Sequence, residues 1–92
     1  MRAIGNTPLI EIESLSKATG CRILAKCEQQ NPGGSVKDRA ALWIIEDAEK
    51  LGIINKDTTI YEASGGNTGI ALAMIGAAKG IKVVITVPKG VA

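Results

Sequence analysis

The sequence predicts an α/β fold in which a parallel sheet is flanked by helices, in three layers. Segments of strand and helix character alternate along the chain, as they do where parallel strands are joined by helical crossovers. Residues 82–87 form a nearly continuous β-branched run, which is typical of a strand buried in a parallel sheet. With 92 residues, of which 46% are hydrophobic, the chain is expected to form one small globular unit over residues 1–92.

The first half predicts a strand over 22–28 and a helix over 36–51, separated by a glycine loop. Ser35 can cap this helix, and Asp38, three residues on, completes an approximate capping box. Gly52 falls where a left-handed residue is expected to end the helix. Apolar residues recur at helical spacing and predict one buried stripe, widened by two neighbours: Ala40, Ile44, Ala48 and Leu51, with Ala41 and Ile45 beside them.

The second half predicts strand, helix and strand again. A polar turn over 55–57 leads into a strand over 58–63, and a second glycine loop follows it. The segment 68–79 is rich in alanine and apolar on nearly all sides, so the helix it predicts is packed between layers. The last strand, over 82–87, is ended by Pro88.

Composition excludes several classes of function. The net charge of +2 and the 2% aromatic content argue against a nucleic-acid surface. The chain has no histidine, which removes Ser-His and Cys-His nucleophiles and the commonest metal ligand, so no metal site is expected. Cys21 and Cys27 are too few for a disulfide framework and are expected to be reduced, structural thiols. Neither a signal peptide nor a membrane-spanning run is visible, which favours a cytoplasmic location or an organelle matrix.

Lys37 is the strongest candidate for chemistry. It lies in the first turn of a predicted helix, where the positive end of the helix dipole repels an ammonium and favours a neutral amine or a bound anion. A free lysine is neutral in only about one molecule in a few thousand at pH 7, so a nucleophilic amine benefits from the helix field and from partial burial. Alone, such a lysine is usually an ordinary solvated charge, but the adjoining glycine loop favours a nucleophile.

The second glycine loop, Ser64-Gly65-Gly66-Asn67-Thr68-Gly69, brings N–H groups, two hydroxyls and an amide to a helix start. Such a loop can receive a carboxylate or a phosphate, although it can also be a plain strand-to-helix turn. Both glycine loops follow predicted strands, so in a parallel sheet they can face one site. The glycine spacing does not fit a dinucleotide fingerprint, and Ile70 stands where a triphosphate-binding loop requires lysine.

Three motifs taken together, at residues 4–9 (Ile-Gly-Asn-Thr-Pro-Leu), 31–39 and 62–70, resemble the cysteine synthase family of pyridoxal-phosphate enzymes. Cystathionine β-synthase shares these motifs, and the resemblance covers nearly the whole chain. It implies the N-terminal part of a two-domain enzyme with a tryptophan-synthase-β-like fold (fold type II).

By this resemblance, Lys37 forms the Schiff base with the aldehyde of pyridoxal 5'-phosphate, and Asn67 contacts the hydroxyl of the cofactor ring. Ser64, Gly65, Asn67 and Thr68 correspond to positions that hold the substrate carboxylate. Family members commonly read Thr-Ser-Gly-Asn-Thr here, so Gly65 stands where a serine is usual. A lost hydrogen bond to a charged group is worth about 1.5 to 3 kcal/mol, which leaves the substrate preference open.

The reaction implied is β-replacement, in which acetate leaves O-acetylserine, an aminoacrylate forms, and sulfide adds to give L-cysteine. Lys37, once displaced by the substrate amine, would take the proton from Cα while the cofactor accepts the electron pair. Cystathionine β-synthase chemistry and a serine or threonine dehydratase, which releases a keto acid, are alternatives that share Lys37. A non-catalytic interaction module that pairs its exposed sheet edge with another copy, or with the rest of an enzyme, is a further alternative.

The resemblance also implies that the cofactor phosphate and the pyridine nitrogen are bound by sequence beyond these motifs. We therefore expect an N-terminal fragment of a longer enzyme that binds the cofactor weakly or not at all by itself. The complete enzyme is expected to be a homodimer that uses a small amino-acid substrate and sulfide.

Overall fold

The structure, a computed structural model, describes residues 2–90. Its elements follow the order β1 (Leu9–Glu11), α1 (Glu13–Thr19), β2 (Leu24–Lys26), a short 3-10 turn (Glu28–Gln30), α2 (Lys37–Lys50), β3 (Thr59–Ala63), α3 (Asn67–Lys79) and β4 (Lys82–Thr86). The predicted α/β class is confirmed. The elements predicted from residue 36 onward all exist, with bounds that differ from the prediction by one residue.

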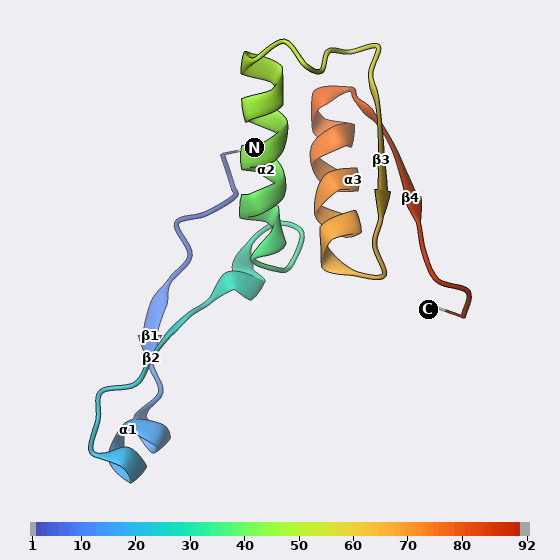
Figure 1. Ribbon diagram of the computed structural model, residues 1–92. Helices are drawn as coiled ribbons and strands as arrows, with labels where there is room; N and C mark the ends of the chain where they lie inside the picture. The colour runs from blue at the N-terminus through green and yellow to red at the C-terminus, as the bar shows by residue number, and fades with distance from the viewer. Residues whose placement is uncertain (1, 91–92) are drawn as a thin grey trace.

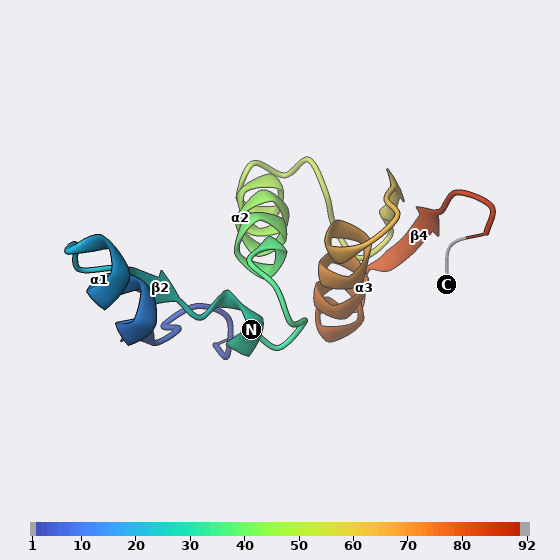
Figure 2. The same cartoon turned by 90° about the horizontal axis from the view of Figure 1, so that it is seen from below.

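The strands form two separate sheets. β3 and β4 are parallel, in a register that runs from Thr59 opposite Lys82 to Ala63 opposite Thr86, and α3 makes the crossover between them. β1 and β2 are antiparallel. The β1–β2 hairpin and α1 project away from the body formed by α2, α3, β3 and β4, which gives the structure an elongated outline of 54 × 35 × 17 Å (Figures 1 and 2).

The expectation that residues 22–28 form a strand of the parallel sheet is wrong. The strand covers only Leu24–Lys26, pairs antiparallel with β1, and passes into the 3-10 turn. Hydrogen bonds from Ile12 N to Ile23 O and from Cys27 N to Pro8 O, both 2.9 Å, extend this hairpin. The sequence did not predict β1 or α1, because a strand of three residues is too short to show an alternating pattern.

Helix α2 begins at a partly predicted cap. The hydroxyl oxygen of Ser35 accepts a hydrogen bond from Lys37 N at 3.2 Å, as a capping serine would. The capping box is not formed, because the Asp38 carboxylate accepts from Gly33 N instead of returning to Ser35. At the other end, Gly52 has the predicted left-handed conformation, with φ of 73°.

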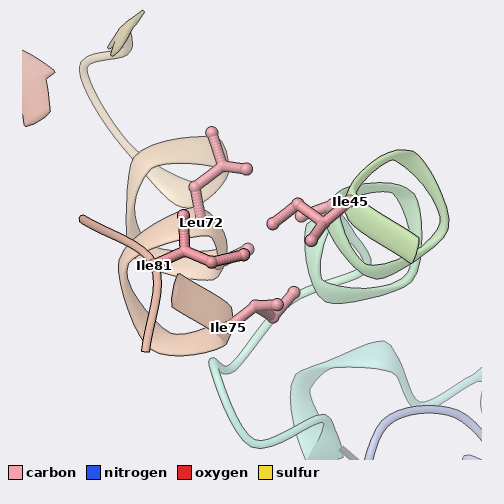
Figure 3. Close-up of a cluster of buried hydrophobic side chains, with 6 residues drawn as sticks. Ile45, Leu72, Ile75 and Ile81 are labelled. Carbon is pink, nitrogen blue, oxygen red and sulfur yellow. The ribbon is translucent and has the colours of Figure 1, made fainter. Parts of the chain in front are cut away.

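The core lies between α2 and α3. Six buried residues form it, and Figure 3 shows Ile45 pointing from α2 toward Leu72, Ile75 and Ile81; Ala41 and Ala71 complete the set. The stripe predicted as the buried face of α2 is therefore misplaced, since Ile44 is 62% exposed. α2 meets α3 through the adjoining side, which carries Ala41 and Ile45.

Helix α3 lies between α2 and the β3–β4 sheet, as its nearly all-round apolar sequence predicted (Figures 1 and 2). The close packing of α3 on β4 depends on Gly76, which has no side chain. A Cβ atom on Gly76 would lie 2.4 Å from Val83 Cγ2 and 2.9 Å from the carbonyl oxygen of Ile81. Residues 2–90 thus supply two parallel strands and the helices on one face of them.

Candidate active site

The N-terminal ends of α2 and α3 lie at the same end of the structure, where β3 also ends (Figure 1). A cavity of about 380 Å³ opens between these elements, and its polar lining comes from Lys37, Glu62 and Thr68. The remaining lining is apolar: Ala40, Ala41, Ile44, Ile45, Ala48, Ile54, Ile60 and Leu72. The structure therefore brings the lysine of the first glycine loop and a threonine of the second to one cavity, as the order of elements suggested.

Lys37 is the first residue of α2 and is exposed at the edge of this cavity. The partial burial expected for it is not found among residues 2–90. The predicted position at the helix N-terminus is confirmed, since Lys37 is the first residue of α2. An exposed amine at the rim of an apolar cavity is accessible to a carbonyl compound.

Ser64 shapes the second loop. Its hydroxyl oxygen accepts hydrogen bonds from Gly66 N at 3.3 Å and from Gly69 N at 3.0 Å, while Ser64 N donates to the carbonyl oxygen of Thr86 at 3.0 Å. The hydroxyl thus stabilises the loop between β3 and α3, and the backbone N–H of Ser64 links this loop to the end of β4. Gly69 N and Ile70 N thus already have acceptors, in Ser64 Oγ and Gly66 O. The N–H groups of Asn67 and Thr68 have no acceptor inside the helix, which suits them to an anion.

The predicted substrate residues do not all face the Lys37 cavity. Thr68 is half-buried and lines it, and Asn67 is exposed at the start of α3. Ser64 and Gly65 instead line two shallower hollows beside the end of β4, of about 280 and 340 Å³. Within the described part of the chain, the second loop therefore lies beside three spaces, one shared with Lys37 and two at the end of β4.

A polar network that sequence reasoning missed joins the start of the chain to α2. The carboxylate of Glu28 accepts hydrogen bonds from the Thr7 hydroxyl and the Arg39 guanidinium, and Arg39 Nη2 also donates to Thr7 Oγ1 at 3.0 Å. The hydrogen bond with Arg39, followed by that with Thr7, lowers the pKa of Glu28 to about 2. A single glutamate gives no sequence pattern from which this network could be predicted. Thr7 and Arg39, which lie in two of the three motifs and had no assigned role, were the available signal.

The side chain of Asn31 makes the second part of this link. Its Oδ1 accepts from Gly5 N at 2.8 Å, and its Nδ2 donates to the carbonyl oxygen of Ser35 at 3.1 Å. Asn31 is only 4% exposed, so these bonds are protected from water. The motif at residues 4–9 thus holds the loop that precedes Lys37.

Glu62 is a second residue without a predicted role. It lies one position before the end of β3, and it lines the Lys37 cavity together with Ile60. Alternate residues of a strand point to the same face, so Glu62 lies on the same face of β3 as Ile60. The spacing of these two residues would predict this placement once the face of β3 that packs against the helices is known.

Among residues 2–90, no three histidine, cysteine, aspartate or glutamate side chains gather as metal ligands. None of the helices in this range combines the length and apolar character needed to cross a membrane. Cys21 and Cys27 are both free; Cys27 is buried, whereas Cys21 is exposed.

An α/β framework that presents an exposed lysine and the start of a second helix at one cavity has the features expected for chemistry at an amine. The sequence profile described as "Pyridoxal-phosphate dependent enzyme" matches residues 1–92, and the chain belongs to this family. The family resemblance inferred from the three motifs is confirmed, and pyridoxal phosphate is the cofactor of the family.

Named relatives agree with this assignment. The chain is 57% identical over 86 residues to cysteine synthase 1 of Emericella nidulans, covering 94% of this chain and 23% of that protein. It is 50% identical over 91 residues to cystathionine beta-synthase of Rattus norvegicus, covering 97% of this chain and 16% of that protein. The chain thus spans at most about a quarter of the length of these curated relatives.

A solved structure gives the same fold. A hydrogen sulfide-producing enzyme from Fusobacterium nucleatum superimposes with a TM-score of 0.92 at 52% identity, covering 99% of this chain and 30% of that one. The match includes the projecting hairpin as well as the helical body, because it covers almost every residue.

The residues present fit the cofactor. Pyridoxal phosphate carries an aldehyde, which needs an accessible amine, and a ring hydroxyl, which a side-chain amide can contact. Lys37 supplies an exposed amine beside an apolar cavity of about 380 Å³. Asn67, the first residue of α3, supplies an exposed amide at the end of the helical body where α2 also begins (Figure 1).

Proposed function

We propose that this chain forms part of an enzyme that carries out pyridoxal-phosphate-dependent β-replacement, converting O-acetylserine and sulfide to L-cysteine and acetate. The observation that supports the proposal is that Lys37 and Thr68 line the same cavity, so that the amine proposed to react lies near the loop proposed to bind the substrate carboxylate. Cysteine synthases from Emericella nidulans and Dictyostelium discoideum, at 57% and 53% identity, support this choice of reaction.

Lys37 has two roles in the proposed mechanism. Its amine would hold the cofactor by its aldehyde, and it would become free for proton transfer once a substrate amine takes that place. The freed amine then takes the proton from the substrate Cα, acetate leaves Cβ with its electron pair, and sulfide adds to Cβ. The Lys37 ammonium returns the proton to Cα. When bound, pyridoxal phosphate accepts the electron pair released at Cα.

The second loop holds the substrate in this proposal. The first N–H groups of α3 and the Thr68 hydroxyl bind the carboxylate, and Asn67 contacts the cofactor ring hydroxyl. The Ser64 hydroxyl contributes by fixing the loop, because its oxygen already accepts from two loop amides. Gly65 leaves out the hydroxyl that is usual in the family, so one carboxylate contact is absent.

A second candidate is the formation of cystathionine. Cystathionine beta-synthase of Rattus norvegicus is 50% identical to this chain, and an O-acetylserine-dependent cystathionine beta-synthase of Helicobacter pylori is 40% identical with a TM-score of 0.85. In that reaction a thiol amino acid replaces sulfide, and Lys37 keeps both roles.

The proposal is tested in a chimera in which the matching stretch of 86 residues of Emericella nidulans cysteine synthase 1 is replaced by that of this chain. Purified chimera is supplied with O-acetylserine and either sulfide or a thiol amino acid, and the products are identified by mass spectrometry. We expect cysteine with sulfide, and no product from the Lys37→Ala chimera. Release of a keto acid would indicate a dehydratase, and a folded chimera without any turnover would contradict the proposal.

A further inference from the structure

Asp38, which follows Lys37 directly, is the most deeply buried charged residue at the site. Its exposed fraction is 0%, whereas Lys37 beside it is exposed. Oδ2 accepts a hydrogen bond from Gly33 N at 2.6 Å. Oδ1 is buried and has no hydrogen-bond partner among the described residues. A carboxylate is costly to bury, so its retention here needs a reason beyond ordinary helix capping.

The partner of this carboxylate is a glycine that leaves room for it. A Cβ atom on Gly33 would lie 2.3 Å from Asp38 Oδ1 and 3.0 Å from Asp38 Cγ. Gly34 has a φ of 87°, whereas Gly33 is not among the residues with positive φ. Gly33 is thus required by the space that the carboxylate occupies, not by its own backbone conformation. We call this pairing the Gly33–Asp38 contact.

The Gly33–Asp38 contact brackets Lys37. It joins residues five apart, one before the helix and one within its first turn. Two further bonds hold the segment between them: Gly34 N donates to Asn31 O at 2.8 Å, and Lys37 N donates to Ser35 Oγ at 3.2 Å. With both flanks fixed, the backbone from which the Lys37 side chain leaves has little freedom to turn.

We propose that Asp38 is a positioning residue, which holds Gly33 and thereby directs the Lys37 amine to the cavity. This inference rests on the proposed function of Lys37. A reacting amine that is pre-oriented avoids the entropy cost of finding its geometry, and a small displacement lowers the rate strongly. The contact acts on Lys37 through the backbone, since the Asp38 side chain faces the loop and the interior.

Two measurements test the inference. In the 92-residue chain, amide hydrogen exchange reports whether Gly33 N–H is protected by the contact. In the chimera, reduction by borohydride in the presence of pyridoxal phosphate, followed by peptide mapping, compares the adduct on Lys37 with adducts on the exposed Lys50 and Lys56. The variants are Asp38→Ala, Gly33→Ala and Asp38→Asn, and the exposed Asp47→Ala on the same helix is the matched control.

We expect Asp38→Ala and Gly33→Ala to lower the Lys37 adduct by roughly tenfold, because a hydrogen bond to a charged group is lost or displaced. Lys50, Lys56 and the Asp47→Ala control should not change. Asp38→Asn keeps an oxygen that can accept from Gly33 N, so its Lys37 adduct should stay within about threefold of the wild type. A merely structural role would not give this rescue.

Each other outcome has a definite meaning. Equal protection of Gly33 N–H in Asp38→Ala and in the wild type would overturn the positioning inference, as would a tenfold loss in a folded Asp38→Asn chimera. If the alanine variants do not fold, the Asp38→Asn comparison decides. A wild-type chimera without a Lys37 adduct would overturn the proposed function instead, while the exchange of Gly33 N–H would still decide whether the contact exists.

Discussion

Gly76 offers a stability test in which two effects have opposite signs. In a helix without tertiary contacts, Gly76→Ala would stabilise by about 1 kcal/mol, because alanine has the higher helix propensity. In this structure the new Cβ would lie 2.4 Å from Val83 Cγ2 and 2.9 Å from Ile81 O. Val83 is β-branched and the second atom belongs to the backbone, so neither moves aside easily.

The overpacking at Gly76 is expected to cost about 2 to 3 kcal/mol, the upper part of the usual range. After subtraction of the helix-propensity gain, the free energy of unfolding should fall by about 1 to 2 kcal/mol. Urea denaturation of the 92-residue chain, followed by circular dichroism, measures it. Ala77→Gly, at an exposed neighbouring position, calibrates helix propensity within the same helix. A Gly76→Ala chain as stable as the wild type would refute the close packing of α3 on β4.

Three further predictions concern the network and the second loop. Glu28→Gln should lower the free energy of unfolding near pH 6, and its difference from the wild type should shrink as the pH falls from about 5 to 2. The pKa of Glu28 is about 2 in the folded chain and 4.5 ordinarily, so the stabilisation by its carboxylate is lost on acidification. Gly65→Ser should leave the urea midpoint unchanged, because the new Cβ would lie at an ordinary contact distance of 3.7 Å from Pro88 Cδ. The same variant should lower the KM of the chimera about tenfold, because the serine hydroxyl adds a hydrogen bond to the substrate carboxylate. Ser64→Ala should cost about 1 kcal/mol of unfolding free energy, as lost helix caps do, measured by the same denaturation.

Matched controls are available for these variants. Glu13→Gln, which removes the carboxylate of an exposed glutamate of α1, is the matched control for Glu28→Gln. Ser14→Ala, at an exposed serine of the same helix, should leave the unfolding free energy nearly unchanged. A Glu28→Gln difference that grows toward pH 2 would contradict the ion-pair network, and a Gly65→Ser chain that loses stability would show that position 65 lacks the space described.

Local signals were sufficient for the part of the fold that carries the site. The glycine loops, the β-branched run and Gly52 act within a few residues of the elements they bound, and they located α2, β3, α3 and β4 to within one residue. The β1–β2 hairpin could not be found in this way, because its strands have three residues each and their pairing is a tertiary choice.

The side of α2 that is buried was also beyond local reasoning. Ile44 and Ile45 are equally apolar but lie on adjoining sides of the helix. The position of α3 alone decides between them, and it buries Ile45 to 2% exposure while leaving Ile44 at the open cavity. The direction of the Asp38 side chain was beyond local reasoning as well. An aspartate in the first turn of a helix suggests a cap, but the sequence does not show that its carboxylate accepts from Gly33 N.

The identity of the reactive amine is tested most directly by trapping it. The wild-type chimera is incubated with pyridoxal phosphate, reduced with borohydride, digested and mapped by mass spectrometry, without any substrate present. We predict that the reduced cofactor adduct is found on the peptide that contains Lys37, and that Lys37→Ala abolishes it. An adduct on another lysine of the chimera, with Lys37 unmodified, would contradict the assignment of Lys37 as the reactive amine.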